Sequence, residues 1–407
     1  GPVASDRVES LRACHNPLRR NGLSCFATML AGVTRPLASR RSPGAGGGMT
    51  VSERLADRSR WVRHVPALLS LAALLGAFIL TAPDATATGS SRHCDFNGDG
   101  FDDAAIGVPG DRVGSVLGAG AVNVIYGSAD GLTAMASQRW TQNSPGIPNK
   151  SEEDDHFGSR VECGDFNGDG YADLVVGAPG ESIGGTRRAG AFHVLFGSAA
   201  GLDSADSLFL HRDKPGVSGT LGSDVFAISL GVGDFNGDGK DDLAVGAIEQ
   251  FRERGGSVQV FPGSVDGLSL SEDKVWHRNR KGIKGKPVSS DDVFGYTLAP
   301  DDFNGDGYDD IAIGVIGDKI NDLDQAGSVN VIYGSPGGLT AAGDQWFHRD
   351  QPGMKGPAEI QFGRDLAGGD FDGDGFGDLA IGVGDRLDGS GSVHILRGTA
   401  DGLTRKG

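Results

Sequence analysis

An all-β fold is predicted by three observations on this sequence of 407 residues. First, an aspartate-rich nonapeptide recurs five times in one register, beginning at Asp95, Asp165, Asp234, Asp302 and Asp370. Second, the steps between copies are 70, 69, 68 and 68 residues, which indicates one repeated structural unit. Third, short apolar runs alternate with glycine-rich turns, without helical spacing of the apolar residues. Units of four strands each predict a β-propeller, with one blade per repeat.

The nonapeptide that opens each unit has the composition of a calcium-binding loop. Its copies read DFNGDGFDD, DFNGDGYAD, DFNGDGKDD, DFNGDGYDD and DFDGDGFGD. Oxygen-bearing side chains stand at places 1, 3, 5 and 9, and Ca²⁺ takes about six to eight oxygen ligands. Glycines at places 4 and 6 let the backbone turn tightly, and place 6 can adopt a left-handed conformation. The sequence therefore predicts about five calcium sites.

Each predicted site combines the side chains of places 1, 3, 5 and 9 with the backbone carbonyl of place 7, and water completes the shell. In chain order the predicted ligands are Asp95, Asn97, Asp99, Phe101, Asp103; Asp165, Asn167, Asp169, Tyr171, Asp173; Asp234, Asn236, Asp238, Lys240, Asp242; Asp302, Asn304, Asp306, Tyr308, Asp310; and Asp370, Asp372, Asp374, Phe376, Asp378. The fifth copy has Asp372 where the others have asparagine, and this fourth carboxylate predicts a tighter site.

Two other interpretations of the nonapeptide are an EF-hand and a plain acidic turn. An EF-hand needs a bidentate glutamate at place 12, whereas place 12 here is always valine or isoleucine, as at Ile106 and Val176. A plain turn also favours Asp, Asn and Gly. Five copies that all keep aspartate at place 9 favour metal ligation over the turn.

The strands of each unit follow the loop in a fixed order. An apolar strand such as DLVVGA comes directly after the nonapeptide, and a second apolar run such as AGAFHVLFGS follows a variable segment. In four units the last strand carries a large apolar residue in matched register, at Trp140, Leu210, Trp276 and Phe347. A loop containing P-G or K-G then leads into the inner strand of the next unit.

A phenylalanine begins the inner strand of the second to fifth units. The pairs are Phe157-Gly158, Phe226-Ala227, Phe294-Gly295 and Phe362-Gly363. We expect the ring to fill space between blades, and the glycine to admit close approach of a neighbouring backbone.

Together these motifs resemble the FG-GAP repeats of the integrin α-subunit propeller and of related bacterial secreted proteins. Only Gly177-Ala178-Pro179 spells GAP in full. The resemblance implies that each calcium loop joins the first and second strands of a blade. It also implies that partners bind the opposite face, through the P-G loops and the loops at Pro109 to Gly120, Pro179 to Gly190, Glu249 to Gly255 and Gly317 to Gly327.

The resemblance further implies a ring of seven blades, whereas the sequence shows five. Their approximate bounds are 88–143, 156–213, 225–280, 293–350 and 361–407. The first has only Thr88 to Cys94 for an inner strand, and the last stops at Gly407 before an outer strand. Either the ring closes with five blades, one of them incomplete, or the chain is a C-terminally truncated member with an open ring. We favour truncation, because natural proteins normally cover the strand edges that an open ring exposes.

The first 87 residues are expected to lie outside the propeller, which occupies residues 88–407. Residues 1–48 lack periodicity and precede Met49, which indicates a disordered extension from a mis-assigned start. Residues 49–87 contain arginines, the apolar run VPALLSLAALLGAFIL and an Ala-Thr-Ala cleavage site, which is typical of a secretory signal peptide. A retained membrane anchor is the alternative, but a spanning helix needs roughly 20 apolar residues. The mature chain is therefore expected to be secreted, without a membrane span.

The net negative charge of the chain bears on which class of partner it can bind. The formal net charge is −17, and residues 1–87, with 11 basic and 5 acidic residues, leave −23 on the remainder. This acidity argues against nucleic-acid binding. The sequence also lacks G-x-S-x-G, H-E-x-x-H and P-loop motifs. We therefore expect a secreted calcium-binding scaffold for adhesion or recognition of an extracellular protein or carbohydrate, rather than an enzyme. The alternative is a secreted hydrolase or lyase, similar to phospholipases or polysaccharide lyases, that uses a propeller site.

Two residue patterns allow more than one interpretation. Cys94 and Cys163 stand at nearly equivalent places before the first two loops, as either a disulfide or two small buried residues. A His-Arg pair recurs at the end of the last strand in units two to four, whereas Thr141-Gln142 replaces it in the first unit. The pair is either part of a site or, as we favour, a set of hydrogen bonders at strand edges and between blades.

Overall fold

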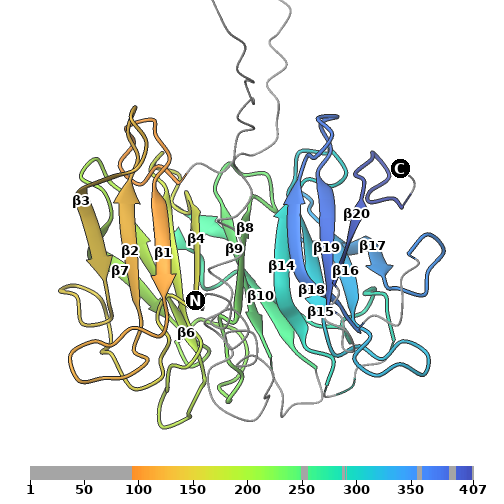
Figure 1. Cartoon of the computed structure of the whole chain (residues 1–407), viewed down its shortest axis with the longest axis horizontal. Helices are drawn as coiled ribbons and strands as arrows, with labels where there is room; N and C mark the ends of the chain where they lie inside the picture. The colour runs from red at the N-terminus through yellow and green to blue at the C-terminus, as the bar shows by residue number, and fades with distance from the viewer. Residues whose placement is uncertain are drawn as a thin grey trace, which may run out of the picture. The chain divides into compact units, whose positions relative to one another are not determined.

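The computed structural model describes residues 94–248, 255–286, 289, 291–354, 360–384 and 391–405. These residues form twenty β-strands and no α-helix, which confirms the all-β fold (Figure 1). Within the same residues, no helix is long and apolar enough to cross a membrane. The N-terminal extension and the signal peptide predicted for residues 1–48 and 49–87 lie outside the described part of the chain.

The described strands form five antiparallel sheets of three or four strands, which we call blades 1 to 5, and one separate two-stranded hairpin. Blade 1 comprises β1 (Ala104–Val108), β2 (Ala121–Tyr126) and β3 (Thr133–Trp140). Blade 2 comprises β4 (Arg160–Gly164), β5 (Asp173–Ala178), β6 (Ala191–Phe196) and β7 (Asp203–Leu210). Blade 3 comprises β8 (Ser229–Gly233), β9 (Asp242–Ala247), β10 (Ser257–Phe261) and β13 (Lys274–Trp276), with a small hairpin of β11 (Gly263–Ser264) and β12 (Gly267–Leu268). Blade 4 comprises β14 (Phe294–Asp301), β15 (Asp310–Val315), β16 (Ser328–Tyr333) and β17 (Thr340–Phe347). Blade 5 comprises β18 (Ile360–Gly369), β19 (Asp378–Gly384) and β20 (Ser392–Leu396).

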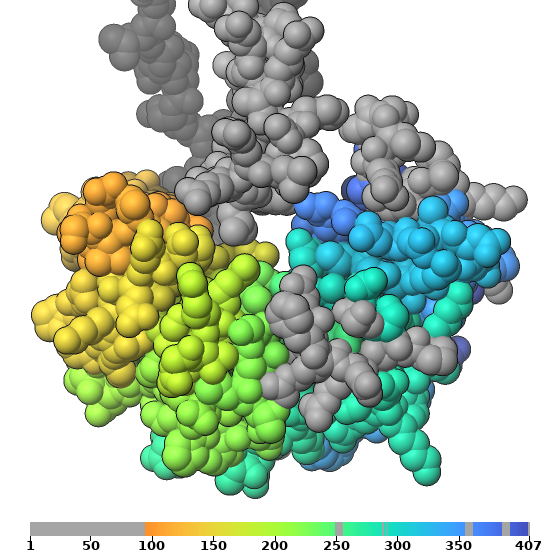
Figure 2. Space-filling view, turned by 90° about the horizontal axis from the view of Figure 1, so that it is seen from below, coloured from red at the N-terminus to blue at the C-terminus, as the bar shows by residue number. Residues whose placement is uncertain are grey.

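Successive blades pack through the first described strand of each sheet, in the order of the sequence. β1 packs against β4, β4 against β8, β8 against β14 and β14 against β18. Figure 2 shows the blades as neighbouring colours, from orange through green to blue. Among the described strands, no comparable packing returns from blade 5 to blade 1, so the sheets form a series of propeller blades that is not closed.

The predicted register of the last strand is confirmed. The large apolar residue lies opposite the second residue of the preceding strand in all four complete pairs, which are Trp140 with Val122, Leu210 with Phe192, Trp276 with Val258, and Phe347 with Val329. Because one register recurs, each blade presents the same residue positions to its neighbours.

The phenylalanine that begins each inner strand lies between blades, as predicted. All four rings are fully buried, and the backbone of Phe157 pairs with Gly120 of the preceding blade. The neighbouring glycines come into close contact: a Cβ built on Gly107 would lie 2.0 Å from the carbonyl oxygen of Gly158. A side chain at Gly107 would therefore force two blades apart.

The two end blades expose apolar residues whose equivalents are buried inside the series. Place 12 is 47% exposed at Ile106 in blade 1 but fully buried at Ile313 in blade 4. Phe371, at place 2 of the fifth loop, is 48% exposed, whereas Phe303 in the fourth loop is fully buried. Equivalent residues thus differ in burial, because a described neighbouring blade packs on both sides of the inner blades only.

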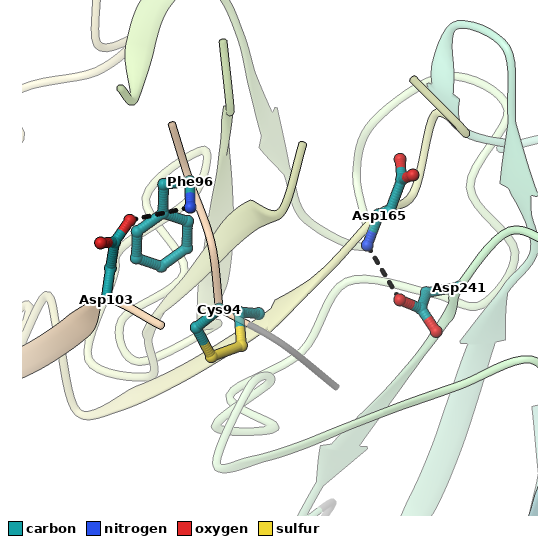
Figure 3. Close-up of a disulfide and its surroundings, with 6 residues drawn as sticks. Cys94, Phe96, Asp103, Asp165 and Asp241 are labelled. Atoms are coloured by element: carbon teal, nitrogen blue, oxygen red, sulfur yellow. Dashed lines mark hydrogen bonds between the residues drawn. A yellow bond between two sulfur atoms is a disulfide. The ribbon is translucent and has the colours of Figure 1, made fainter. Parts of the chain in front are cut away.

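A disulfide joins Cys94 to Cys163 in β4, which settles the interpretation that the sequence left open (Figure 3). The two Cα atoms lie 5.6 Å apart, within the usual range for a disulfide. The bridge spans 69 residues and ties the segment before the first nonapeptide to blade 2. It therefore crosses the boundary between the first two blades.

Loss of this disulfide should lower the free energy of unfolding by about 2–4 kcal/mol, because the bridge restricts the unfolded chain over a long loop. Urea unfolding of the wild type, with and without reductant, measures this effect. In a Cys94→Ser/Cys163→Ser double variant the effect of the reductant should disappear. Equal stability of the wild type and the double variant under oxidising conditions would contradict the prediction.

Candidate metal centre

The first nonapeptide folds into a turn whose own backbone amides point at the predicted ligands. Asp95 accepts hydrogen bonds from the N–H groups of Asp99, at 3.1 Å, and Gly100, at 2.8 Å. Asn97 Oδ1 accepts from the same Asp99 N–H at 2.9 Å, and Asp99 Oδ1 accepts from Phe101 N–H at 3.0 Å. These bonds hold the side-chain oxygens of places 1, 3 and 5 on the inside of the turn.

The same geometry recurs in all five loops. In loops two to five the place-1 aspartate accepts the place-6 N–H at 2.9, 2.9, 2.9 and 3.0 Å. The glycines at place 6 have φ between 84° and 90°, and those at place 4 between 68° and 77°. The predicted left-handed conformation at place 6 is confirmed, and place 4 shares it.

The aspartate at place 9 has a structural role that the sequence analysis missed. In the fourth loop, Asp310 is fully buried and accepts hydrogen bonds from Phe303 N–H at 3.0 Å and Gly334 N–H at 2.8 Å. Asp103 does the same with Phe96, at 2.8 Å (Figure 3), and Gly127, at 2.7 Å. Place 9 therefore ties the start of the loop to the turn after the second strand that follows this loop, which is β2 in blade 1 and β16 in blade 4.

Burial makes the place-9 carboxylates of the first four loops weaker acids than a free aspartate. It raises the pKa of Asp173 and Asp310 to about 8 and the pKa of Asp242 to about 7. The backbone hydrogen bonds oppose this shift, and the aspartates at places 1 and 5 of the same loop increase it. The pKa of Asp103 is raised for the same first cause. A bound cation would favour the charged form of each carboxylate.

Adjacent loops are hydrogen-bonded to each other across the blade boundary, through place 8. The N–H of Asp241 donates to the carbonyl oxygen of Asp165 at 3.0 Å, and the Asp165 N–H donates to Asp241 Oδ2 at 2.8 Å (Figure 3). Asp309 and Asp234 repeat both bonds at 3.0 Å. The Asp-Asp pair at places 8 and 9 is the sequence signal for this contact, but ligand spacing predicts a role for place 9 alone.

Side chains at place 7 pack on the preceding loop. A Cβ built on the place-4 glycine would clash with the next loop's aromatic ring, at 2.6 Å for Gly98 and Tyr171, 2.5 Å for Gly237 and Tyr308, and 2.6 Å for Gly305 and Phe376. Glycine at place 4 therefore serves the contact between loops as well as the turn. The place-7 carbonyl as a metal ligand stays a prediction.

The fifth loop has an extra carboxylate, and an arginine side chain from outside the loop contacts it. Oxygens of Asp370, Asp372 and Asp374 all lie within 4.8 Å of one another. Arg397 Nη1 lies 3.0 Å from Asp372 Oδ2 and 2.5 Å from Asp378 Oδ2. The fourth carboxylate is therefore matched by a guanidinium, which weakens the charge argument for a tighter site here.

The loops after β1, β5 and β15 lie at the strand ends away from the nonapeptides, because each nonapeptide immediately precedes one of these strands. They include the predicted partner-binding segments 109–120, 179–190 and 317–327. Most of the segment Glu249 to Gly255 lies outside the described residues.

The recurring arginines connect blades, as the structural interpretation of the His-Arg pair predicted. Arg212 Nη2 donates to Ser257 Oγ of blade 3 at 2.7 Å, and Arg278 Nη2 lies 2.7 Å from Asp318 Oδ2 of blade 4. Both arginines are buried. Arg349 differs, since its Nε contacts the adjacent Asp350 at 3.2 Å.

Comparison with known proteins agrees with this repeat structure. The FG-GAP repeat family matches residues 157–195, 226–261, 294–332 and 362–396, which begin at the buried phenylalanines of blades 2 to 5. Phosphatidylinositol-glycan-specific phospholipase D of Bos taurus is 37% identical over 165 residues, which is 39% of this chain and 18% of that protein. Integrin alpha-8 of Mus musculus is 30% identical over 305 residues, which is 72% of this chain and 25% of that protein. The chain thus spans a quarter or less of the length of these relatives.

Proposed function

This chain is an FG-GAP repeat protein, and from that premise we propose that it is a calcium-stabilised extracellular scaffold that binds a protein or a carbohydrate. The observation that supports the proposal most is the fivefold loop whose places 1, 3 and 5 face one turn. The predicted ligand atoms are all oxygens, which suits Ca²⁺. Bound calcium would offset the repulsion among aspartates that also connect neighbouring loops.

The calcium loops, in this proposal, hold the scaffold together, and recognition occurs at the opposite strand ends. Each boundary on the calcium side already uses its loop residues for hydrogen bonds and packing between blades. The loops at 109–120, 179–190 and 317–327 vary in sequence between blades, as a recognition surface requires. The similarity to integrin alpha-8, which spans 72% of this chain, favours the adhesion function.

A hydrolase is the second candidate, and the similarity to phosphatidylinositol-glycan-specific phospholipase D favours it. One experiment separates the two. The purified protein is applied to glycan and protein arrays with calcium or chelator, and the same preparation is incubated with a glycosylphosphatidylinositol-anchored protein. Reproducible calcium-dependent capture without release of the anchor supports the scaffold. Release of the anchor at catalytic protein concentrations would overturn it in favour of the hydrolase.

Stabilisation by calcium should grow as the pH rises from about 5 to about 8. In the metal-free protein burial raises the pKa of Asp173 and Asp310 to about 8, whereas an unfolded aspartate titrates near 3.9. The metal-free folded state therefore holds protons that the unfolded state has released, and its stability falls as the pH rises through this window. Calcium replaces those protons, so the calcium-bound protein should not show this loss. Thermal unfolding of both forms at three pH values checks the prediction, and a difference that is independent of pH would contradict it.

A further inference from the structure

A buried arginine neutralises two buried aspartates at the boundary between blades 3 and 4. Arg278 lies two residues after β13. Its Nη2 lies 2.7 Å from Asp318 Oδ2, and its Nη1 lies 3.6 Å from Asp292 Oδ2. Its Nη2 also donates to Ser328 Oγ at 3.3 Å. All three charged side chains are at most 3% exposed. Arg212 repeats the arrangement at the preceding boundary, with Asp224 Oδ2 at 3.4 Å and Ser257 Oγ at 2.7 Å.

The boundary between blades 1 and 2 has the same backbone. Equivalent N–H to carbonyl bonds place Asp155 where blade 4 has Asp292, and Glu181 where it has Asp318. These bonds are Gly180 to Asp155 at 3.1 Å and Gly317 to Asp292 at 3.0 Å, and then Gly190 to Glu181 and Gly327 to Asp318, both at 3.0 Å. Like their equivalents, Asp155 and Glu181 are buried.

The sequence has no arginine at the equivalent position of this first boundary. Gln142 stands two residues after β3, where the other boundaries have Arg212 and Arg278, and Ala191 replaces the serine that those arginines bind. Glu152 adds a third carboxylate to the cluster. Its backbone N–H donates to Asp155 Oδ2 at 2.5 Å, in the same way as the N–H of Ser289 donates to Asp292 at 2.9 Å. The cluster therefore has three carboxylates and an amide, where blade 4 has two carboxylates, a hydroxyl and a guanidinium.

The cluster also contains buried oxygens without a partner. Carboxylate oxygens of Glu152, Asp155 and Glu181 lie within 4.8 Å of one another. Gln142 Nε2 donates to Glu181 Oε2 at 2.5 Å, but Glu181 Oε1 and Gln142 Oε1 have no hydrogen-bond partner, although the two residues are 0% and 1% exposed. Burial raises the pKa of Glu181 to about 7, against the opposing hydrogen bonds of the Gln142 and Asn149 side chains, and it raises the pKa of Asp155 to about 6. Unpaired buried oxygens of this kind are costly unless something binds them.

We propose that this cluster binds one divalent cation of the calcium class, which takes the place of the arginine used at the other boundaries. Oxygens of Glu152, Asp155, Glu181 and Gln142 would be the protein ligands, and such hard oxygen donors suit Ca²⁺. The ligands come from the end of blade 1, from the segment that leads into β4, and from the loop after β5. The ion would therefore join blades 1 and 2 at the strand ends opposite the nonapeptides, and it is additional to the five loop sites.

The arginines at the other boundaries suggest the variant that tests this proposal. Gln142→Arg reproduces the arginine of the other boundaries, so it should displace the ion and keep the fold. Native mass spectrometry in Ca²⁺ should count one bound ion fewer in Gln142→Arg and in Glu181→Gln than in the wild type. Asp130→Asn removes one carboxylate from an exposed turn and should leave the count unchanged. Anomalous diffraction from crystals containing Tb³⁺ should show a peak beside Glu181 in the wild type that Gln142→Arg lacks.

Equal ion counts in the wild type, Gln142→Arg and Glu181→Gln would overturn the proposal and assign the neutralisation of the cluster to protons. Ions found at the nonapeptides, without a peak beside Glu181, would also overturn it and leave the proposed calcium scaffold intact. If Gln142→Arg fails to fold, the Tb³⁺ peak in the wild type and the count for Glu181→Gln decide the question.

Discussion

Removal of calcium should lower the free energy of unfolding of this protein by about 7 kcal/mol, relative to the same protein in about 10 mM Ca²⁺. Extracellular calcium modules have dissociation constants on the order of 10⁻⁴–10⁻³ M. A site at about ten times its dissociation constant contributes about 1.4 kcal/mol when only the folded state binds the ion, and the sequence contains five loops. The structural reason is that a place-1 aspartate which would ligate calcium is also bonded to the neighbouring loop, as Asp165 is when its N–H donates to Asp241 of place 8.

Differential scanning calorimetry in Ca²⁺ and in EGTA measures this effect, and a decrease in melting temperature of about 15 °C is expected. Mg²⁺ at the same concentration is the control and should stabilise less, because it requires a smaller, octahedral site. A melting temperature that does not respond to EGTA would contradict the calcium proposal.

Replacement of a place-9 aspartate should destabilise the protein even without calcium. Asp310→Ala removes the acceptor for the buried N–H groups of Phe303 and Gly334. An unpaired buried donor costs about 1–3 kcal/mol, so the total loss should be about 2–6 kcal/mol in EGTA. In calcium the loss should be larger, because the variant also lacks a predicted ligand.

The matched control is Asp306→Ala in the same loop. Asp306 is exposed and accepts a hydrogen bond from Tyr308 N–H at 3.0 Å. This variant should lose about 1.4 kcal/mol of calcium-dependent stabilisation but should unfold like the wild type in EGTA. Urea unfolding of both variants, in calcium and in EGTA, measures the difference. Equal losses for the two variants in EGTA would show that place 9 has no structural role beyond ligation.

Local patterns in the sequence were sufficient to predict the blade. Strand order, the register of Trp140 and Phe347, the left-handed glycines and the buried Phe157 depend on residues within one repeat and its border. Each of these features recurs, so five copies of the pattern reinforced the same interpretation. The EF-hand was also excluded by a local feature, since the place-12 residue is apolar and lies within the β-strand that follows each loop.

Contacts between repeats were not predictable in the same way. The Asp165 N–H and the Asp241 carboxylate are 76 residues apart and meet only because one blade packs against the next. Tyr171 was predicted for its carbonyl, but its ring packs on Gly98 of the previous loop. Arg397 was not identified, because this partner of Asp372 lies just after β20, 25 residues further along the repeat.

The sequence by itself determined the all-β blades, the five repeats that are visible in it, and the oxygen-rich turn that opens each repeat. These properties depend on the period of the repeat and on residue types within nine positions. Only the tertiary structure decided which carboxylates are buried, which are paired with a cation, and which lack one. Gln142 and Arg278 occupy equivalent positions in the repeat, yet the consequence of that difference depends on the charges that a neighbouring blade brings beside them. Burial and electrostatic pairing are properties of the packed interface between blades, and the sequence of one repeat does not specify them.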